Sequence, residues 1–243
     1  MRILIAGGGR LAVSVMEPLL DSGHQVIGLL QDGRKTPPNR RALFRTTRLV
    51  VPPALDPLSL AMRRRVPVFW VNRMDEAELA PLRAREPDLL LTAGFRIIFN
   101  DATLSLPGLG SVNVHSSLLP KHRGASPFAH VILDGEQETG VTFHAMTTSI
   151  DSGDMLAQDS FALTEIDTSV TVYYRCCDLA RQMVVDVMDD IETWGLIGTP
   201  QDESLATYDP RMDDTRAAID WRDPAERIER LVRAAAAYHP AWF

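Results

Sequence analysis

The sequence predicts an α/β protein built on a Rossmann-like, mostly parallel sheet that is flanked by helices and followed by a short helical C-terminal tail. Two observations predict this class. Apolar runs typical of strands alternate with amphipathic runs typical of helices over most of the chain, which is the pattern of β-α-β units. The 243 residues are also enough for one large domain, or for one domain with a small appendage.

The first elements follow a β-α-β order. An apolar strand covers residues 2–6, and a helix with apolar residues at helical spacing covers residues 11–20. A glycine turn separates them, and a second strand follows at residues 25–30. Two strands joined through a helix predict parallel neighbours in one sheet.

The glycine turn has two interpretations. Gly7 and Gly9 are followed by Ala12, and Asp32 comes roughly twenty residues later, which matches a relaxed form of the dinucleotide fingerprint. On that interpretation the chain is a nicotinamide-dependent dehydrogenase or a non-catalytic dinucleotide binder. On the other, the glycines only let the first helix pack closely on the sheet.

The middle of the chain continues the alternation. We expect strands over 46–51, 66–71 and 88–93, with helices over 56–65 and 76–85. A polar loop precedes these elements, and its basic residues either contact an anionic acceptor or are solvated. These residues are Arg34, Lys35, Arg40 and Arg41.

The second half contains fewer and longer elements. A helix is expected over 126–133, strands over 140–146 and 155–163, and a long amphipathic helix over 168–194. The predicted buried side of the long helix consists of Val170, Tyr173, Tyr174, Cys177, Leu179, Met183 and Val187.

One strand between these halves carries polar residues that suggest chemistry. Val112 and Val114 alternate with Asn113 and His115, so the amide and the imidazole lie on the same face of a strand. Pro120 ends the extended run soon afterwards. The two side chains therefore lie at the end of a strand, where open α/β sheets place their sites.

An amide and an imidazole have a plausible joint chemistry. Asn113 can donate hydrogen bonds to a developing oxyanion, and His115 can take a proton from an attacking amine near neutral pH. A carboxylate usually orients such a histidine, and Asp151 or Asp154 in the turn IDSGD is available for that role. Spacing alone leaves the choice between these two aspartates open.

Two long stretches carry a resemblance to a known family. NVHSSLLPKHRGASPF begins at Asn113, and GVTFHAMTTSIDSGDML begins at Gly140. Together they resemble the folate-dependent formyltransferases, which include methionyl-tRNA formyltransferase and the sugar-nucleotide and aminoarabinose N-formyltransferases. The resemblance implies the formyltransferase fold and places the family's catalytic residues on Asn113, His115 and Asp151.

The same resemblance implies the partners and their binding residues. It implies 10-formyltetrahydrofolate as co-substrate, no metal, and a primary amine as acceptor. The residues implied for reduced folate are Gly94, Phe95, Arg96, Ile97, Ile98, Ser149, Ile150 and Asp154. The acceptor is expected at Ser116, Lys121, His122, Arg123 and Gly124, because Lys121, His122 and Arg123 concentrate positive charge beside the strand that carries His115 and could contact an anionic acceptor.

The C-terminal part resembles a linker in two of these relatives. We expect a catalytic domain over 1–200 and a linker with a helical tail over 201–243, where the relatives continue into a β-barrel. The missing barrel favours a small acceptor, most simply an amino sugar linked to a nucleotide. Alternatives are a methionyl-tRNA formyltransferase fragment, an enzyme formylating an amino-acid-like natural-product precursor, and a formyltetrahydrofolate hydrolase.

Composition excludes several other classes. The formal net charge of -7 gives no basic footprint, so we expect no nucleic-acid partner. Cys176 and Cys177 are adjacent, which is not a metal or disulfide spacing. No apolar run reaches membrane-spanning length and no signal peptide precedes the first strand, so we expect a cytoplasmic protein without a membrane partner. Oligomeric state is left open, a homodimer included.

Overall fold

The structure is a computed structural model that describes residues 1–34, 56–237 and 241–242. Its strands are β1 (Arg2–Gly7), β2 (Gln25–Asp32), β3 (Val68–Val71), β4 (Leu89–Ala93), β5 (Gly110–His115), β6 (Arg123–Gly124), β7 (Glu138–Ala145), β8 (Met155–Ala162) and β9 (Tyr208–Asp209). Its helices are α1 (Gly9–Asp21), α3 (Pro57–Arg63), α4 (Glu76–Arg83), α5 (Asp101–Leu104), α6 (Pro127–Leu133), α7 (Ser169–Trp194), the 3₁₀ turn η1 (Glu203–Leu205) and α8 (Ala225–Ala235).

The main sheet confirms the predicted α/β class. Its seven strands follow the order β3-β2-β1-β4-β5-β7-β8. The first five are parallel, whereas β7 pairs antiparallel with β5 and β8 antiparallel with β7. The carboxyl ends of β1, β4 and β5 therefore meet at one edge, where open α/β sheets build sites.

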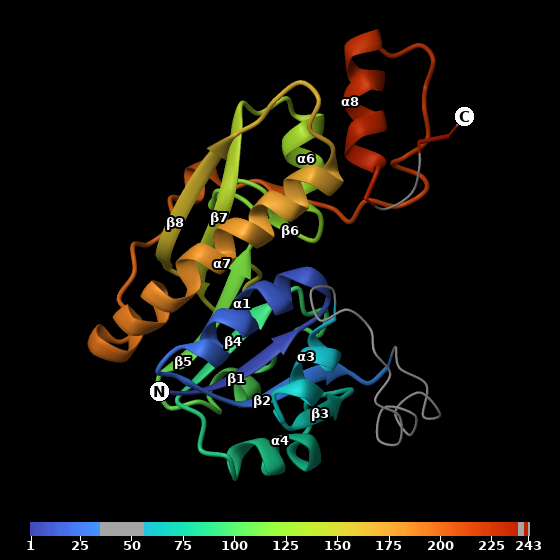
Figure 1. Ribbon diagram of the computed structural model, residues 1–243. Coiled ribbons are helices and arrows are strands. Elements are labelled where there is room, and N and C mark those ends of the chain that lie inside the picture. The colour runs from blue at the N-terminus through green and yellow to red at the C-terminus, as the bar shows by residue number, and fades with distance from the viewer. Residues whose placement is uncertain (35–55, 238–240, 243) are drawn as a thin grey trace.

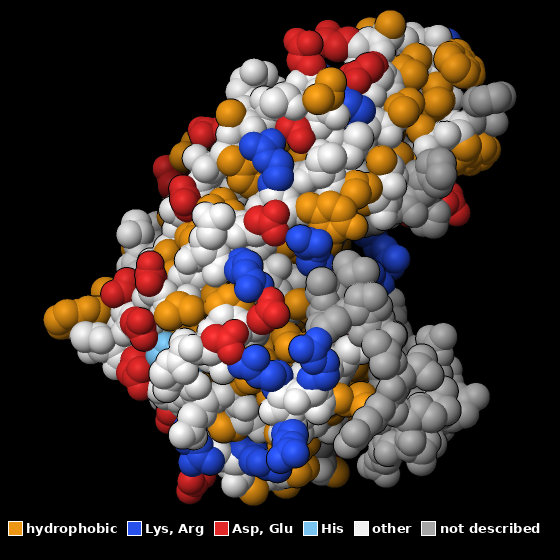
Figure 2. Space-filling model, in the orientation of Figure 1, with side chains coloured by type: hydrophobic (Ala, Val, Ile, Leu, Met, Phe, Trp, Pro, Cys, Tyr) orange, Lys and Arg blue, Asp and Glu red, His pale blue; other side chains and the backbone are white. Residues whose placement is uncertain are grey.

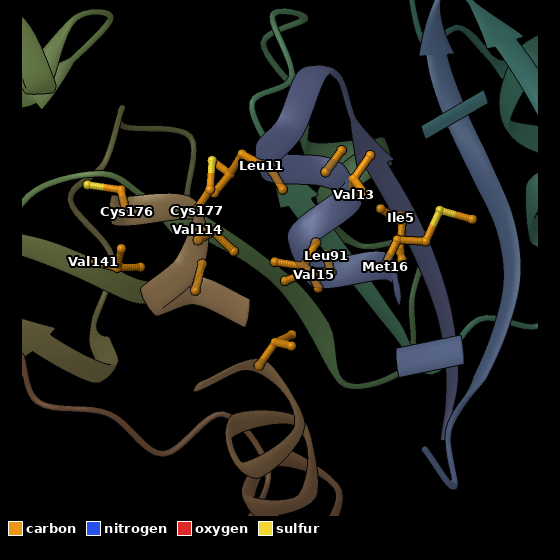
Figure 3. Packing of buried hydrophobic residues seen from close by; sticks show 14 of the residues in the cluster. Ile5, Leu11, Val13, Val15, Met16, Leu91, Val114, Val141, Cys176 and Cys177 are labelled. Atoms are coloured by element: carbon orange, nitrogen blue, oxygen red, sulfur yellow. The ribbon is translucent and has the colours of Figure 1, made fainter. Parts of the chain in front are cut away.

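Helices cover the sheet on both faces (Figure 1). The side chains of its strands alternate between the two faces. Ile3 and Ile5 of β1 point into a core with α1 and α7, while Leu4 and Ala6 point into a second core with α4. Figure 3 shows the first core, where side chains of α1, α7 and the central strands meet. This alternation is the period-2 pattern that marked the strands in the sequence.

The long helix begins as predicted, but its buried face is rotated from the predicted one. Thr168 caps α7, accepting a hydrogen bond from the Thr171 N–H. Tyr174 was predicted to be buried and is 43% exposed, with the Arg10 guanidinium 4.9 Å from its ring centre. The buried face instead runs through small and branched residues that allow close contact with α1: Val172, Cys176, Cys177, Ala180, Val184, Val187, Met188 and Ile191.

The chain beyond α7 returns to the middle of the molecule. β9 pairs in parallel with β6 in a separate two-stranded sheet, and α8 packs against α6 (Figure 1). Basic and acidic side chains are interspersed over the face drawn in Figure 2. None of the described helices is both long and apolar enough to cross a membrane. The predicted strand over 46–51 and residues Lys35, Arg40 and Arg41 lie outside the described residues.

Candidate active site

Strand β5 brings Asn113 and His115 to the carboxyl edge of the sheet. Val112 and Val114 point into the core with α1 and α7, so Asn113 and His115 lie on the opposite face. The His115 side chain is 5% exposed at the very end of the strand. In the register of β5 and β7, Asn113 lies opposite His144.

Asp151 reaches these two residues from the turn between β7 and β8. Its Oδ2 lies 3.5 Å from His115 Nδ1, and its Oδ1 accepts a 3.4 Å hydrogen bond from Asn113 Nδ2. The Gly124 N–H donates to Oδ2 at 2.8 Å. Between the two candidate aspartates, Asp151 is thus the one that contacts His115, while Asp154 is exposed and joins the Ala145 N–H through its carbonyl.

The turn depends on a glycine at one position. A Cβ on Gly153 would lie 1.9 Å from the carbonyl oxygen of Ala145, closer than any side chain can approach. Only glycine lets the backbone pass so near β7. This close passage holds the turn against the end of the strand that carries His144, and so delivers Asp151 to the site.

His144 is a member of the site that sequence reasoning did not assign. Its Nδ1 donates to the Ala145 carbonyl at 2.9 Å, so its Nε2 carries the lone pair and accepts a 3.1 Å hydrogen bond from Asn113 Nδ2. The same Nε2 lies 3.5 Å from Asp151 Oδ1. The only signal in the sequence was its place at the end of the motif GVTFH, and pairing of that strand with β5 was needed to interpret it.

The partner of His115 Nε2 fixes the tautomer of the ring. Nε2 lies 2.8 Å from the carbonyl oxygen of His122, and a carbonyl oxygen only accepts hydrogen bonds. Nε2 therefore carries a proton, and Nδ1, which faces Asp151, is the nitrogen that gains and loses one. The two atoms of the ring have separate tasks: Nε2 anchors the ring and Nδ1 is available for proton transfer.

Charges in the site follow from burial and from these contacts. Burial lowers the pKa of His115 and outweighs the nearby Asp151 carboxylate, so the ring is neutral at pH 7. Burial alone would raise the pKa of Asp151, but its contacts with His115 and with the Gly124 N–H outweigh burial and lower the pKa to about 2. The resting site thus holds an ionised carboxylate beside a neutral imidazole, a pair suited to accept one proton and stabilise it.

The segments implied for folate lie around this pair. Ala93 pairs with Val114, so Gly94 leaves β4 at the edge where His115 ends β5. Phe95 is half-buried and Arg96 exposed; Ile97 packs into the core with α4, and Ile98 is 75% exposed beside it. On the other side Ile150 is also exposed. The Ser149 carbonyl accepts hydrogen bonds from the hydroxyls of Thr147 and Ser152 within the turn.

The residues implied for the acceptor are engaged within the protein. Lys121 Nζ bonds Glu136 at 2.9 Å, and His122 is buried with its Nδ1 2.9 Å from Asp209 Oδ2. Ser116 is likewise buried. Arg123 is completely buried, and its guanidinium donates to the side chains of Gln201, Glu203 and Tyr208.

These contacts differ from the predicted role of the loop. The positive charge of Lys121, His122 and Arg123 was expected to face an anionic acceptor. Acidic side chains of the same chain neutralise it instead: Lys121 pairs with Glu136, which follows α6, whereas His122 and Arg123 pair with Asp209 and Glu203, which follow α7. Two of the five predicted acceptor residues contact the candidate catalytic side chains through their backbone: the Gly124 N–H donates to Asp151, and the His122 carbonyl accepts from His115 Nε2.

Two groups of histidine and carboxylate residues in the described parts of the chain have the arrangement of metal ligands. One joins His24 to Asp189 and Glu192, and the other joins His122 to Asp134 and Asp209. In both, a ring nitrogen already lies within hydrogen-bonding distance of a carboxylate oxygen, 3.1 Å for His24 and 2.9 Å for His122. Glu192 of the first group pairs with the N-terminal ammonium, and Asp209 of the second with His122, so we assign a metal to neither group.

Comparison with known proteins identifies a family. A family model described as formyl transferase matches residues 2–188. The methionyl-tRNA formyltransferase of Methylobacillus flagellatus is 35% identical over 236 residues, which are 96% of this chain and 74% of that protein. The enzyme of the same name from Pseudomonas syringae is 35% identical over 235 residues, 96% of this chain and 72% of its own.

Solved structures share the fold at lower identity. An N-formyltransferase from Helicobacter canadensis, in complex with folinic acid and dTDP-3-aminofucose, gives a TM-score of 0.73 at 20% identity, covering 96% of this chain and 79% of its own. HypX from Aquifex aeolicus, in complex with tetrahydrofolic acid, gives 0.69 at 19% identity, covering 99% and 35% respectively. At these identities the similarity concerns the fold alone.

Proposed function

Because this chain belongs to the formyl transferase family and so to the formyl-transferring enzymes, we propose that it moves a formyl group from 10-formyltetrahydrofolate to a primary amine. The observation that carries the proposal is that the Asp151 carboxylate contacts both Asn113 and His115 at the carboxyl end of β5. These groups supply hydrogen-bond donors for an oxyanion, a base for the amine and a carboxylate for the charged base.

In the proposed reaction, His115 Nδ1 carries a proton from the acceptor amine to the folate. The acceptor amine attacks the formyl carbon, and the carbonyl oxygen becomes an oxyanion. His115 Nδ1 takes the proton lost by the amine, and Asp151 stabilises the imidazolium that forms. That proton then passes to the departing folate nitrogen as its bond to the formyl carbon breaks, which returns His115 to the neutral state.

In this proposal Asn113 stabilises the oxyanion, and to do so its amide must give up one of the hydrogen bonds that it makes in the resting site. Both N–H groups of its amide are engaged, one with His144 Nε2 and one with Asp151 Oδ1. The bond to Asp151 is the longer, at 3.4 Å, and is the easier one to exchange for a bond to substrate. Donation to the oxyanion would then leave His144 holding the amide in place.

The proposed folate site lies between the segment after β4 and the turn that carries Asp151. Exposed Ile98 and Ile150 offer apolar contacts to the pterin ring, and Gly94 and Arg96 are exposed residues of the segment after β4. Ser149 and Asp154 would complete the site from the turn. Two structural neighbours support a folate as co-substrate, since one was solved in complex with folinic acid and the other with tetrahydrofolic acid.

The first candidate acceptor is a small molecule with a primary amine, an amino sugar linked to a nucleotide. The net charge of -7 favours it, because a polynucleotide acceptor depends on many cationic contacts. The pairing of Lys121 and Arg123 with glutamates of the same chain points the same way. The structural neighbour solved with dTDP-3-aminofucose offers a concrete compound of this class.

The second candidate acceptor is methionyl-tRNA. The observation that favours it is the 35% identity to two enzymes named methionyl-tRNA formyltransferase, over 96% of this chain. The two acceptors differ in how their use depends on salt. Use of a tRNA should fall steeply with salt, because each phosphate contact releases counterions, whereas use of a nucleotide sugar should fall little.

One experiment tests donor and acceptor together. The purified protein is incubated with 10-formyltetrahydrofolate and either dTDP-amino sugars, amino-acid-like amines or methionyl-tRNA, and each product is examined by mass spectrometry for one added formyl group. A reaction without acceptor measures hydrolysis, the formyltetrahydrofolate hydrolase alternative. Formylation of no amine, together with micromolar binding of a nicotinamide cofactor and none of a folate analogue by calorimetry, would overturn the proposal.

A further inference from the structure

The segment after α7 passes directly behind the catalytic residues. We call residues 201–209 the strap; it contains η1 and β9. Through β9 it pairs with β6, so that Tyr208 lies beside Arg123 and Asp209 beside Gly124. The strap is thus hydrogen-bonded to the loop that leaves β5. Two of its side chains also bond groups that adjoin the catalytic side chains: Gln201 bonds the Asp151 backbone, and Asp209 bonds His122.

Gln201 forms the first connection. Its amide nitrogen donates to the backbone carbonyls of Asp151 and Gly153, at 2.8 and 2.7 Å. Its amide oxygen accepts from Nε and Nη2 of the buried Arg123, at 3.0 and 2.7 Å. One side chain, itself 9% exposed, therefore ties the turn that carries Asp151 to the loop that follows His115.

Asp209 and Thr207 form the second connection, to His122. Asp209 Oδ2 lies 2.9 Å from His122 Nδ1, and Thr207 Oγ1 accepts the His122 N–H at 2.7 Å. Both the ring and the backbone of His122 are therefore fixed. The His122 carbonyl accepts the hydrogen bond that His115 Nε2–H donates.

The backbone at both contacts with His115 is strained. His122 has φ of 61° and Asp151 has φ of 52°, the left-handed region that side chains with a Cβ rarely adopt. Such backbone conformations are unfavourable and persist only when their surroundings hold them. In both, the strap supplies partners: Gln201 for the carbonyl of Asp151, and Thr207 and Asp209 for His122.

We propose that the strap positions His115 and Asp151 for proton transfer, with Gln201 and Asp209 as positioning residues for the formyl transfer proposed above. Asp209 holds the His122 carbonyl against His115 Nε2, which keeps the proton-transferring lone pair on Nδ1. Gln201 holds the turn that presents the Asp151 carboxylate to that same nitrogen. Neither strap residue contacts the catalytic side chains, so both act through the residues they hold.

Gln201 bonds Arg123 through its amide oxygen and the Asp151 turn through its amide nitrogen, so a substitution that changes only the nitrogen tests the contact with the turn. A glutamate keeps the oxygen that accepts from Arg123 but loses the N–H groups that Asp151 and Gly153 require, and it repels their carbonyls. Gln201→Glu should therefore lower kcat for formyl transfer about tenfold to a hundredfold, the scale of a small misplacement of a reacting group. The KM for 10-formyltetrahydrofolate should change less than about threefold.

Gln137→Glu is the matched control, since Gln137 is exposed and the change in charge is the same. It should leave kcat unchanged. Circular dichroism and binding of a non-reactive folate analogue establish that each variant is folded, and kcat is then expressed per folate-binding site. A kcat for Gln201→Glu equal to that of Gln137→Glu would overturn the role of Gln201.

A second measurement needs neither turnover nor an identified acceptor. Long-range nitrogen–proton NMR of ¹⁵N-histidine-labelled protein reports which ring nitrogen of His115 carries the proton, with His115→Asn used to assign the signal. We expect the Nε2–H tautomer at neutral pH, a mixture of tautomers in Asp209→Ala, and recovery of Nε2–H in Asp209→Asn, which keeps an acceptor for His122. An Nδ1–H tautomer in the unmodified protein, or an unchanged His115 signal in folded Asp209→Ala, overturns the inference.

The formylation assay and the NMR measurement distinguish a failure of the proposed reaction from a failure of the positioning by the strap. If no amine is formylated but His115 has the Nε2–H tautomer and responds to Asp209→Ala, the proposed reaction is wrong and the positioning by the strap stands. If amines are formylated and the tautomer is unaffected by the strap, the reaction stands and the positioning is wrong.

Discussion

Two strand ends at the same edge of the sheet each contain a motif typical of a functional site, yet they have different roles. The turn after β1 contains the glycine pattern of a dinucleotide site, and the end of β5 contains an amide and an imidazole. In the turn, a Cβ on Gly7 would lie 2.5 Å from the Ala93 carbonyl oxygen and 2.7 Å from the Ala12 Cβ. This glycine serves the close packing of α1 on the sheet.

The start of α1 is also covered, which removes the feature that a dinucleotide would use. A pyrophosphate binds the free N–H groups at such a helix start. Here the Leu11 N–H donates to the hydroxyl of Tyr173, a residue of α7, at 3.1 Å. At the end of β5, by contrast, the polar groups contact one another and retain the means to exchange a proton. The neighbouring elements, rather than the motif, decide which strand end is a site.

The largest test of this comparison removes the groups at the end of β5. His115→Asn, Asn113→Ala and Asp151→Asn should each lower turnover by about two to four orders of magnitude, the range for lost acid–base or oxyanion groups. The losses should be strongly non-additive in double variants, because the three groups act on one proton and one oxyanion. Steady-state kinetics checks this, and near-full turnover of His115→Asn would remove the proposed reaction.

The next test moves to the glycine turn. Gly7→Ala places a methyl group against the Ala93 carbonyl and should destabilise the fold by on the order of 2–3 kcal/mol, as overpacking of a core does. Turnover per folded molecule should stay within about twofold, because no catalytic group contacts Gly7. Urea denaturation and kinetics measure the two quantities separately. A large loss of turnover in a fully folded variant would contradict the packing role.

Much of the fold could be predicted because its signals are local. The alternation of Val112 and Val114 with Asn113 and His115 correctly separated the two faces of β5, and the amphipathic pattern found α7 to within one residue at its start. The face of α7 was harder, because apolar character did not distinguish Tyr174 from its neighbours. Contact with α1 selected the small residues instead.

The site was only partly predictable because its contacts are long-range. His144 becomes a partner of Asn113 only through the pairing of β5 with β7, and the strap residue Gln201 reaches Asp151 across 50 positions of sequence. Arg123 was interpreted as an acceptor contact because it belongs to a cationic loop beside the strand that carries His115. Its burial depends on Gln201 and Glu203, whose proximity no local pattern reveals.

Acid provides a smaller test that is specific to the end of β5. The pKa of Asp151 falls from an ordinary 3.8 to about 2, so its ionised form stabilises the fold fully above pH 3.8, and the contribution is lost as pH falls towards 2. The difference corresponds to about 2 kcal/mol. Denaturation curves from pH 6 down to pH 2 should therefore show a shallower loss of stability for Asp151→Asn than for the unmodified protein. Parallel curves would contradict the assigned pKa.

The smallest expected effect concerns the start of α1, next to the glycine turn. Tyr173→Phe removes the acceptor of the Leu11 N–H, and a buried donor left without a partner costs about 1–2 kcal/mol of stability. Turnover should be unchanged. If the hydroxyl alone concealed a dinucleotide site, its removal would expose the start of α1, and calorimetry would detect new binding of a nicotinamide cofactor. We expect none, because the ring, packed 5.2 Å from that of Phe128, still covers the helix start, and Gly7 still has no space for a ligand beside it.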